Sequence, residues 1–254
     1  MTLLSLEGVS VTLEKKTILS GISFTLEEGG FYMIAGPNGA GKTTIVRAIA
    51  GSVPYDGKIL YRARDVRTFR PDALARHIGI LAQTNPSGFA FTVLEVVRLG
   101  RYAYGKGLFH TANRTEDAEA VRLALELTGM EGLQHRKVNT LSGGEVQRMF
   151  LAQLFAQNPE VMVLDEPANH LDPVFQQQVF SLVDAWRRET GRAVLSVVHD
   201  LSIAKAYGTD ALLLNNGQIV AKGRTADVFT PENLQKTYDM DVAGWMRRML
   251  SQWT

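Results

Sequence analysis

Residues 36–43 read Gly36-Pro37-Asn38-Gly39-Ala40-Gly41-Lys42-Thr43, which matches the pattern G-x-x-x-x-G-K-(S/T). The segment follows the apolar run 31–35 and precedes an amphipathic stretch, 44–50. In that context the glycines let backbone N–H groups turn around phosphate oxygens, and the start of a helix adds positive charge. Lys42 would reach the β and γ phosphates, and the Thr43 hydroxyl would bind Mg²⁺. We therefore predict a phosphate-binding loop; a glycine-rich turn with an ordinary surface lysine is the alternative.

Four short apolar runs each end in a residue with an obvious chemical use. They are 31–35 before Gly36, 78–81 before Gln83, 161–164 before Asp165 and Glu166, and 193–198 before His199. Runs that are apolar on both faces are typical of parallel strands covered by helices. The carboxyl ends of such strands meet at one edge of the sheet, where ligands bind. We expect these polar residues to line one crevice.

Helical and antiparallel patterns fill the rest of the chain. A helix is predicted over Pro173–Thr190, because Asp172 can cap its start and Gly191 can end it. The stretch from about 89 to 157 is mostly helical in character and interrupts the sheet pattern. Alternating apolar runs at 4–13 and 18–26 predict antiparallel strands.

Size and composition exclude several classes of protein. The chain has 254 residues, a formal net charge of +1 and no cysteine. It therefore has no overall basic field for nucleic acid, and no disulfide, thiolate metal site or cysteine nucleophile. No apolar run approaches the roughly 18 residues of a bilayer crossing, so we expect any membrane association to go through other subunits or the surface. Residues 1–13 lack a signal-peptide pattern and should stay in the mature protein.

Two adjacent carboxylates, Asp165 and Glu166, end a buried apolar run. Carboxylates in such a place need partners, because burying an unpaired charge is costly. An Mg²⁺ ion held partly through water by Asp165, with Glu166 free to polarise an attacking water, would account for both. A helix cap or a structural ion pair is the alternative for this segment taken alone.

A second segment suited to phosphate reads Leu141-Ser142-Gly143-Gly144-Glu145 at the start of a predicted helix. A serine and two glycines there make another anion-binding helix start. A capping box with a flexible turn fits these residues equally well, so the segment alone decides nothing. Beside the loop at 36–43, however, it gives one chain two phosphate-binding devices far apart in sequence.

Together these segments resemble the nucleotide-binding subunit of ABC (ATP-binding cassette) transporters, in the family's order and over nearly the whole chain. The matches are Walker A at Gly36–Thr44, the Q-loop at Gln83, the signature at Leu141–Glu145, Walker B at Val161–Asp165 with Glu166 next, the D-loop at Ala168–Asp172 and the H-loop at His199. The resemblance implies a head-to-tail dimer with two ATP molecules, each between one chain's Walker A and the other's signature. It also implies multi-spanning permease subunits, a substrate-binding protein, no nucleic acid, and a peripheral place on the cytoplasmic face of the inner membrane.

The fold class implied is α/β: a P-loop NTPase (RecA-like) parallel-sheet core with an antiparallel β extension and an inserted helical subdomain. The expected boundaries within this single ATPase domain are 1–88 and 156–230 for the core, 89–155 for the helical signature subdomain and 231–254 for a C-terminal helical segment.

Residue roles carry over from the same resemblance. Glu166 is the catalytic base or orients the attacking water, His199 holds the γ-phosphate and that water, and Gln83 reaches the metal or the water. The catalytic set is Lys42, Gln83, Glu166 and His199; the Mg²⁺ ligands are Thr43, Gln83 and Asp165; ATP contacts Gly36, Pro37, Asn38, Gly39, Ala40, Gly41, Lys42, Thr43 and Thr44 of one chain and Ser142, Gly143 and Gly144 of the other.

The sequence departs from the family at position 13, where an aromatic residue that stacks on adenine is usual. Leu13 offers apolar contact without a π face, so we expect weaker or less selective adenine binding. His170, within the D-loop, has no assignable hydrolytic role.

Local features resemble one subfamily, the importer ATPases for iron-siderophore, haem and cobalamin. The marks are Thr92-Val93, Leu99-Gly100-Arg101-Tyr102, Gly107-Leu108-Phe109 and Asn169-His170-Leu171-Asp172. Phe89 and Phe91 would lie in the groove that receives the permease, although packing inside the helical lobe fits them nearly as well.

The C-terminus has apolar residues at helical spacing, from Val242 through Trp245 and Met249 to Trp253, with Arg247 and Arg248 on another face. Such a helix can pack on its own domain, on a second copy or at a lipid surface.

Rival functions share part of these motifs. An importer ATPase for another substrate, or an ABC ATPase outside transport, shares every catalytic motif, but the latter class usually has tandem cassettes, coiled-coil insertions or basic surfaces. A P-loop GTPase or kinase would lack the signature and Glu166. A non-enzymatic binding module is disfavoured because every hydrolytic residue is present.

Overall fold

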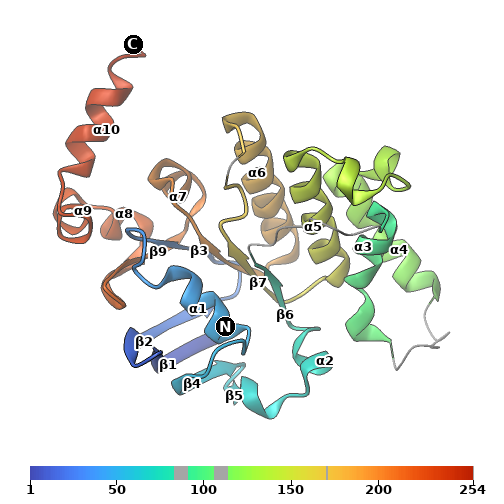
Figure 1. Cartoon of the computed structure of the whole chain (residues 1–254), viewed down its shortest axis with the longest axis horizontal. Helices are drawn as coiled ribbons and strands as arrows, with labels where there is room; N and C mark the ends of the chain where they lie inside the picture. Colours follow the sequence, from blue (N-terminus) through green and yellow to red (C-terminus); the bar gives the residue numbers. More distant parts are fainter. Residues whose placement is uncertain (83–90, 106–113, 170, 254) are drawn as a thin grey trace. The chain divides into compact units, whose positions relative to one another are not determined.

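The computed structural model describes residues 1–82, 91–105, 114–169 and 171–253. They form two compact units, one of residues 1–66 with 193–254 and the other of residues 67–192. Figure 1 shows the order of the elements along the chain. The functional segments are shared between the two units.

The first unit contains a four-stranded antiparallel sheet in the order β2-β1-β4-β5. Its strands are β1 (Thr2–Leu13), β2 (Lys16–Glu27), β4 (Asp56–Tyr61) and β5 (Arg64–Asp65). A tight turn joins β1 to β2, and its residues Glu14 and Lys15 have φ angles of 48° and 67°, as hairpin turns between twisted strands require. The two strands predicted near the N-terminus are thereby confirmed as antiparallel partners.

The same unit holds the strand that leads into the phosphate loop. β3 (Phe31–Ala35) pairs in parallel with β8 (Ala193–Val197) on one side and with β9 (Asp210–Asn215) on the other. β10 (Gln218–Arg224) adds an antiparallel edge to β9. Every residue of β3 and β8 is buried, which explains their unbroken apolar runs.

Five helices complete the described part of the first unit. α1 (Lys42–Ile49) follows β3, and α7 (Leu201–Tyr207) follows β8. The chain then ends in α8 (Thr225–Val228), α9 (Pro231–Tyr238) and α10 (Val242–Leu250). α10 extends away from the rest of its unit (Figure 1), and the helix predicted there is confirmed.

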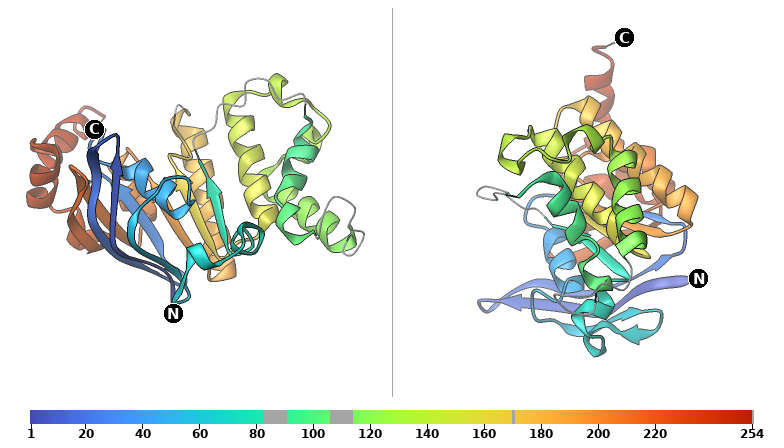
Figure 2. Two further views of the ribbon diagram at one scale, coloured as in Figure 1. Left: turned by 60° about the horizontal axis from the view of Figure 1, so that its bottom comes forward. Right: turned by 90° about the vertical axis from the view of Figure 1, so that its right-hand side faces the viewer.

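The second unit combines a parallel strand pair with a helical bundle. β6 (Ile78–Leu81) pairs in parallel with β7 (Val161–Asp165). The helices are α2 (Pro71–Leu74), α3 (Val93–Leu99), α4 (Arg114–Thr128), α5 (Gly143–Gln157) and α6 (Pro173–Thr190), with short 3-10 turns η2 (Tyr102–Tyr104), η3 (Glu131–Leu133) and η4 (Val138–Thr140). η1 (Val66–Thr68) leads into the unit. α3, α4 and α5 lie side by side (Figure 2).

The helix bounds follow local signals. Asp172 accepts hydrogen bonds from the backbone N–H groups of Val174 and Phe175, and Gly191 ends α6 with a φ of 68°. Thr92 forms a capping box with Glu95 at the start of α3. Between α3, α4 and α5 the apolar side chains are almost fully buried, among them Val97, Leu125, Met149 and Leu151.

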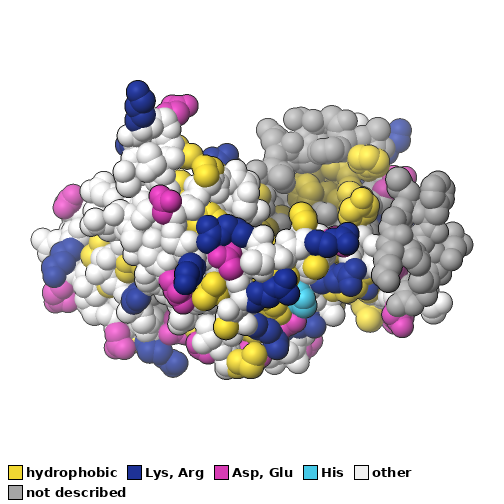
Figure 3. Space-filling model, turned by 90° about the horizontal axis from the view of Figure 1, so that it is seen from below, with side chains coloured by type: hydrophobic (Ala, Val, Ile, Leu, Met, Phe, Trp, Pro, Cys, Tyr) yellow, Lys and Arg dark blue, Asp and Glu magenta, His cyan; other side chains and the backbone are white. Residues whose placement is uncertain are grey.

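The predicted α/β fold is confirmed, with parallel strands, an antiparallel β part and a helical insertion. In the part of the chain that the structure describes, no helix combines the length and the apolar character that a membrane crossing needs. On the described surface seen in Figure 3, Lys and Arg side chains lie among Asp and Glu side chains.

Candidate nucleotide-binding site

The phosphate loop begins where β3 ends and runs to the first turn of α1. Gly36, Gly39 and Gly41 have φ angles of 153°, 78° and 102°, which residues with a side chain rarely adopt. A Cβ atom on Gly36 would lie 2.0 Å from the carbonyl oxygen of Leu214 on β9. Gly41 is the N-cap of α1 and has no side chain to occupy the helix start. The loop therefore suits an anion that binds backbone N–H groups.

Lys42 is the first residue of α1, and its side chain reaches back over the loop. Its Nζ donates hydrogen bonds to the carbonyl oxygens of Gly36 at 2.8 Å and Pro37 at 3.0 Å. The residue is 5% exposed. Because a buried ammonium needs strong acceptors, this cation is held by the loop where phosphate oxygens would bind.

A hairpin turn from late in the chain supports this loop. The N–H of Gly217, between β9 and β10, donates to the carbonyl oxygen of Ala40 at 3.1 Å, and the N–H of Ser20 on β2 donates to the Gly217 carbonyl at 2.9 Å. A Cβ atom on Gly217 would lie 2.2 Å from the Ile18 carbonyl oxygen. The glycine thus allows the turn to fit between β2 and the loop and to hold the loop's shape.

In the second unit, Asp165 and Glu166 stand at the carboxyl end of β7, as predicted. Asp165 is 3% exposed. Glu166 is half-buried and has a φ of 54°, an unfavourable angle for a residue with a side chain. Its Oε2 accepts a hydrogen bond of 2.8 Å from the side-chain amide of Asn169. The chain therefore turns sharply after β7, and a hydrogen bond from Asn169 fixes the direction of the Glu166 carboxylate.

The carboxylate set fits Mg²⁺ bound mainly through a nucleotide. Among the described residues, no three His, Cys, Asp or Glu side chains gather as a metal cage. Mg²⁺ in nucleotide enzymes uses one or two carboxylates together with phosphates and water. A single buried carboxylate such as Asp165 matches the carboxylate part of that ligand set.

The signature segment forms the start of α5. Ser142 is its N-cap: its hydroxyl accepts from the N–H of Glu145, whose carboxylate accepts from the N–H of Ser142 at 2.6 Å. The capping box, one of the two interpretations of the sequence, is therefore present. Those bonds to the Ser142 backbone and hydroxyl hold the pKa of Glu145 below its usual range.

Gly144 allows close packing within that helix start. Gly144 is buried, and a Cβ atom on it would lie 3.2 Å from the ring of Phe175 on α6. Ser142 and Gly143 are exposed, so the helix start is accessible to a ligand or a partner.

His199 lies between β8 and α7 and is exposed. Asp200, next to it, caps α7 by accepting from the N–H groups of Ser202 and Ile203. His199 lines a cavity of about 700 Å³ together with residues of α10, among them Trp245 and Trp253. The C-terminal segment thus borders the predicted H-loop.

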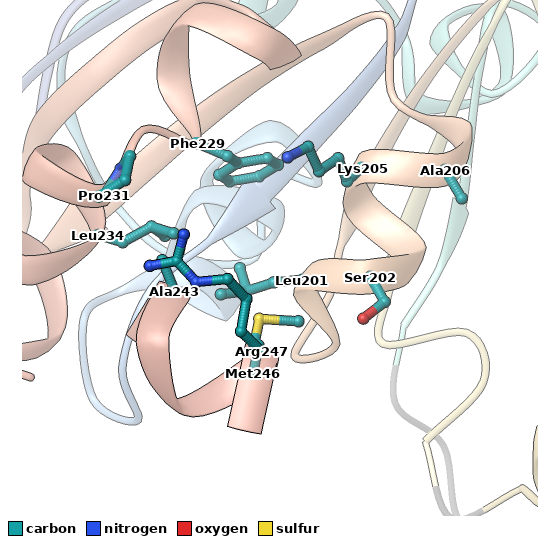
Figure 4. Close-up of a pocket in the computed structure, with 10 residues that line it drawn as sticks. All are labelled: Leu201, Ser202, Lys205, Ala206, Phe229, Pro231, Leu234, Ala243, Met246 and Arg247. Carbon is teal, nitrogen blue, oxygen red and sulfur yellow. The ribbon is translucent and has the colours of Figure 1, made fainter. Parts of the chain in front are cut away.

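The C-terminal helices enclose a second cavity, of about 560 Å³, beside α7 (Figure 4). Its apolar walls include Leu201, Phe229 and Met246, and the cationic side chains of Lys205 and Arg247 also line it.

On α9, burial raises the pKa of Tyr238, while a hydrogen bond with the Gly36 backbone opposes that rise. The carboxyl end of α9 therefore lies beside the phosphate loop.

α10 is only partly covered by its own unit. Val242 and Gly244 are buried, whereas Trp245, Met249 and Trp253 are 45%, 47% and 88% exposed. Packing on the chain's own domain thus accounts for the start of the helix and leaves most of its apolar face in contact with solvent.

Several predicted residues lie outside the described residues: Gln83, Phe89, the segment 107–109 and His170. Of the remainder, Phe91 is 47% exposed, as a surface contact would be. Leu13 is half-buried at the end of β1, opposite Lys16.

Comparison with known families decides the class of the chain. The profile of the family described as ABC transporter matches residues 19–169, more than half of the chain. The chain belongs to the ABC transporter family. It is an ATP-binding subunit and an ATPase of that family, and its ligand is a nucleotide. The resemblance drawn from the ordered motifs is confirmed.

Named relatives of this ABC subunit match most of its length. The ferric enterobactin transport ATP-binding protein FepC of Escherichia coli is 35% identical over 92% of this chain and 87% of its own. The hemin import ATP-binding protein HmuV of Rhizobium johnstonii is 36% identical over 91% of this chain and 89% of its own. The ABC transporter ATP-binding protein YvrA of Bacillus subtilis is 37% identical over 93% of this chain, which spans 53% of that longer protein.

Solved structures agree with the fold of the ABC subunit. An inward-facing ABC transporter described as of the metal-chelate type superposes with a TM-score of 0.82 and 26% identity, over 94% of this chain and 90% of that one. An ATP-binding cassette in its ADP conformation superposes with a TM-score of 0.81 and 26% identity, over 92% of this chain and 98% of that one. Cassettes of this family dimerise and work with membrane permeases.

Sequence reasoning missed the bond from Asn169 to Glu166. In the sequence Asn169 belongs to the D-loop match and to a subfamily mark, and its place three residues after the carboxylate puts a side-chain amide within reach of the same turn. The support that Gly217 gives to the phosphate loop left no local signal in the sequence.

Proposed function

We propose that this chain powers an ABC importer for an iron-siderophore, haem or cobalamin-type metal chelate. The observation that carries the proposal is the set of relatives named for ferric enterobactin and hemin import that match over nine tenths of the chain. The metal-chelate type neighbour supports it. An importer for another substrate, or an ABC ATPase outside transport, remains the alternative.

The site residues divide the work of phosphoryl transfer, which depends on positioning and charge stabilisation. The loop at 36–44 binds the phosphates through its backbone N–H groups, which Pro37 lacks, and through the Lys42 side chain. Thr43, Asp165 and Gln83 would hold Mg²⁺, which neutralises charge on the phosphates when bound. Glu166, held by Asn169, orients and polarises the attacking water, and His199 holds the γ-phosphate and that water.

We further propose that the active site is completed by a second copy in a head-to-tail dimer. Ser142, Gly143 and Gly144 of the second copy would contact the γ-phosphate of the ATP bound at the first copy's loop. Support comes from the exposure of Ser142 and Gly143 at a helix start. A two-fold axis lets both phosphate-binding devices of each chain be used.

The same proposal places the dimer on the cytoplasmic face of the inner membrane, under multi-spanning permease subunits and together with a substrate-binding protein. The segment 89–155 would be the helical signature subdomain, between core segments 1–88 and 156–230. The C-terminal helical segment would be 231–254.

The Glu166→Gln variant tests the proposed head-to-tail dimer. It should bind ATP and stay dimeric, because the water can no longer be polarised while every phosphate contact remains. Light scattering after size exclusion measures the mass with saturating ATP and Mg²⁺. A variant that stays monomeric contradicts the proposed dimer.

Co-purification tests the proposal that the chain works in a transporter. The tagged chain, extracted in detergent from its native membrane, should bring down a multi-spanning membrane protein. The reconstituted complex should then move a ferric siderophore, haem or a cobalamin in an ATP-dependent way. Recovery of a cytosolic partner alone contradicts the proposed role in transport. Transport of an unrelated solute contradicts the proposal that the substrate is a metal chelate.

A further inference from the structure

The carboxyl end of α5, the helix that starts at the signature, is capped by side chains from another segment of its unit. The last four carbonyl groups of any α-helix lack partners within the helix. In α5 the N–H of Asn158 donates to the carbonyl oxygens of residues 154 and 155. Two carbonyls, those of Ala156 and Gln157, then need partners from elsewhere.

Both partners come from the segment that follows α3. Arg101 Nη1 donates to the Ala156 carbonyl oxygen at 2.9 Å, and the Tyr104 hydroxyl donates to the Gln157 carbonyl oxygen at 2.9 Å. All four terminal carbonyls of α5 therefore have donors. A cation at this end also interacts favourably with the helix dipole.

Arg101 is held firmly in this position. Its Nε donates to Asp117 Oδ1 of α4 at 2.7 Å, and its guanidinium carbon lies 3.7 Å from the centre of the Tyr104 ring. The side chain of Arg101 is 14% exposed. A guanidinium that bonds a carboxylate and a carbonyl while stacking on a ring cannot be replaced by lysine without loss.

The residue before Arg101 fits closely against α5. A Cβ atom on Gly100 would lie 2.1 Å from the carbonyl oxygen of Gln153 and 3.0 Å from the nitrogen of Gln157. The end of α3 can approach the α5 backbone this closely because position 100 has no side chain.

The same end of α5 is bonded to the segment leading into β6. The side-chain amide of Gln157 donates to the carbonyl oxygens of Ala75 and Ile78. Arg76 Nε donates to the Ala103 carbonyl oxygen at 2.7 Å. The carboxyl end of α5 is therefore tied both to α3 and to the strand region of its unit.

We propose that Arg101 and Tyr104 are positioning residues for the signature. α5 has 15 residues, a rigid rod of about 22 Å, so fixing its carboxyl end sets the direction in which Ser142 is presented at its amino end. The inference rests on the proposed function, in which that end binds the nucleotide of a second copy. Within the subfamily mark Leu99-Gly100-Arg101-Tyr102, Gly100 and Arg101 would thus serve to hold α5 in place.

The test measures dimerisation separately from nucleotide binding. In the Glu166→Gln background, Arg101→Gln and Tyr104→Phe are compared with the control Arg122→Gln. Arg122 makes two ion pairs, with Glu119 at 2.7 Å and Glu126 at 2.9 Å, both on the exposed face of α4. Full-length proteins are titrated with ATP and Mg²⁺, and their dimer dissociation constants are measured by analytical ultracentrifugation.

We expect Arg101→Gln to raise the dimer dissociation constant roughly tenfold and Tyr104→Phe about threefold, since charged hydrogen bonds contribute more than neutral ones. ATP binding to the monomer should stay within about twofold for each, because the phosphate loop is untouched. In the background with Glu166 intact, kcat should fall while KM for ATP stays constant. A purely structural role would not split these two constants.

Two outcomes overturn the proposal. Dimer constants equal to that of the control overturn it. If Arg101→Gln does not fold, Tyr104→Phe decides, since it keeps the ring and loses only the hydroxyl. If the Glu166→Gln protein itself stays monomeric, the proposed head-to-tail dimer is wrong, and the positioning role is wrong with it.

Discussion

The hydrogen bond between Asn169 and Glu166 offers a sharp test of the proposed chemistry. Replacing Asn169 with alanine removes the amide that donates to Glu166 Oε2 at 2.8 Å. The carboxylate then loses one of the contacts that hold its direction, while the phosphate loop and its lysine keep theirs. The variant should therefore hydrolyse ATP more slowly without binding it less tightly.

The size of the effect follows from the exposure of the bond. A hydrogen bond to a charged group contributes about 1.5–3 kcal/mol. Because Asn169 is exposed, water replaces part of that, and about 1 kcal/mol of transition-state stabilisation is lost, equivalent to roughly a fivefold lower kcat. Asn169→Asp, which sets a like charge against Glu166, should lose more.

The assay is steady-state phosphate release over a range of ATP concentrations. Asn233→Ala on α9 is the control, since it also loses a side-chain amide bond, to the Val228 carbonyl oxygen at 3.1 Å. The reasoning is refuted if Asn169→Ala keeps the kcat of the control. It is refuted equally if KM rises while kcat is unchanged, because that pattern marks lost nucleotide binding.

Three further predictions use other parts of the chain. The bonds from Ser142 lower the pKa of Glu145, so its capping should stabilise the fold above the unfolded glutamate pKa of about 4.3, and this stabilisation should be lost as pH falls through the lower folded pKa. The difference in the free energy of urea unfolding between the parent and Glu145→Ala should therefore be constant near neutral pH and shrink in acid, and a difference that grows in acid would contradict the prediction. Leu13→Tyr should tighten ATP binding by supplying a π face, and an unchanged dissociation constant in titration would remove that idea. Truncation after Asp241 should lower stability or dimerisation rather than intrinsic ATP chemistry; loss of hydrolysis in a truncated protein that folds and dimerises would contradict this.

Features governed by local chemistry were predictable from the sequence. The helix α6 has the bounds that Asp172, Pro173 and Gly191 indicate, since each acts on its own backbone within one turn. The phosphate loop likewise follows from consecutive residues between a strand and a helix. Periodicity identified the C-terminal helix α10.

Features that depend on distant partners were not predictable. The short strands β4 and β5 have weak patterns of their own and exist through pairing with β1 and with each other. Arg101 belongs to a subfamily mark in the sequence, but its structural role was not predictable, because its acceptor, Ala156, lies on a helix far along the chain. For α10, periodicity defined an apolar face, and tertiary packing decided that only the first residues of the helix are buried.

The pairing of β3 has a consequence for how the chain is made. Its two neighbours, β8 and β9, and the turn at Gly217 that supports the phosphate loop all come after Gly191. During synthesis from the N-terminus, the loop emerges long before any of these partners, and non-local parallel pairing forms slowly. The loop's residues are therefore synthesised early, whereas the strands and the turn that hold its shape become available only after residue 217 has been synthesised.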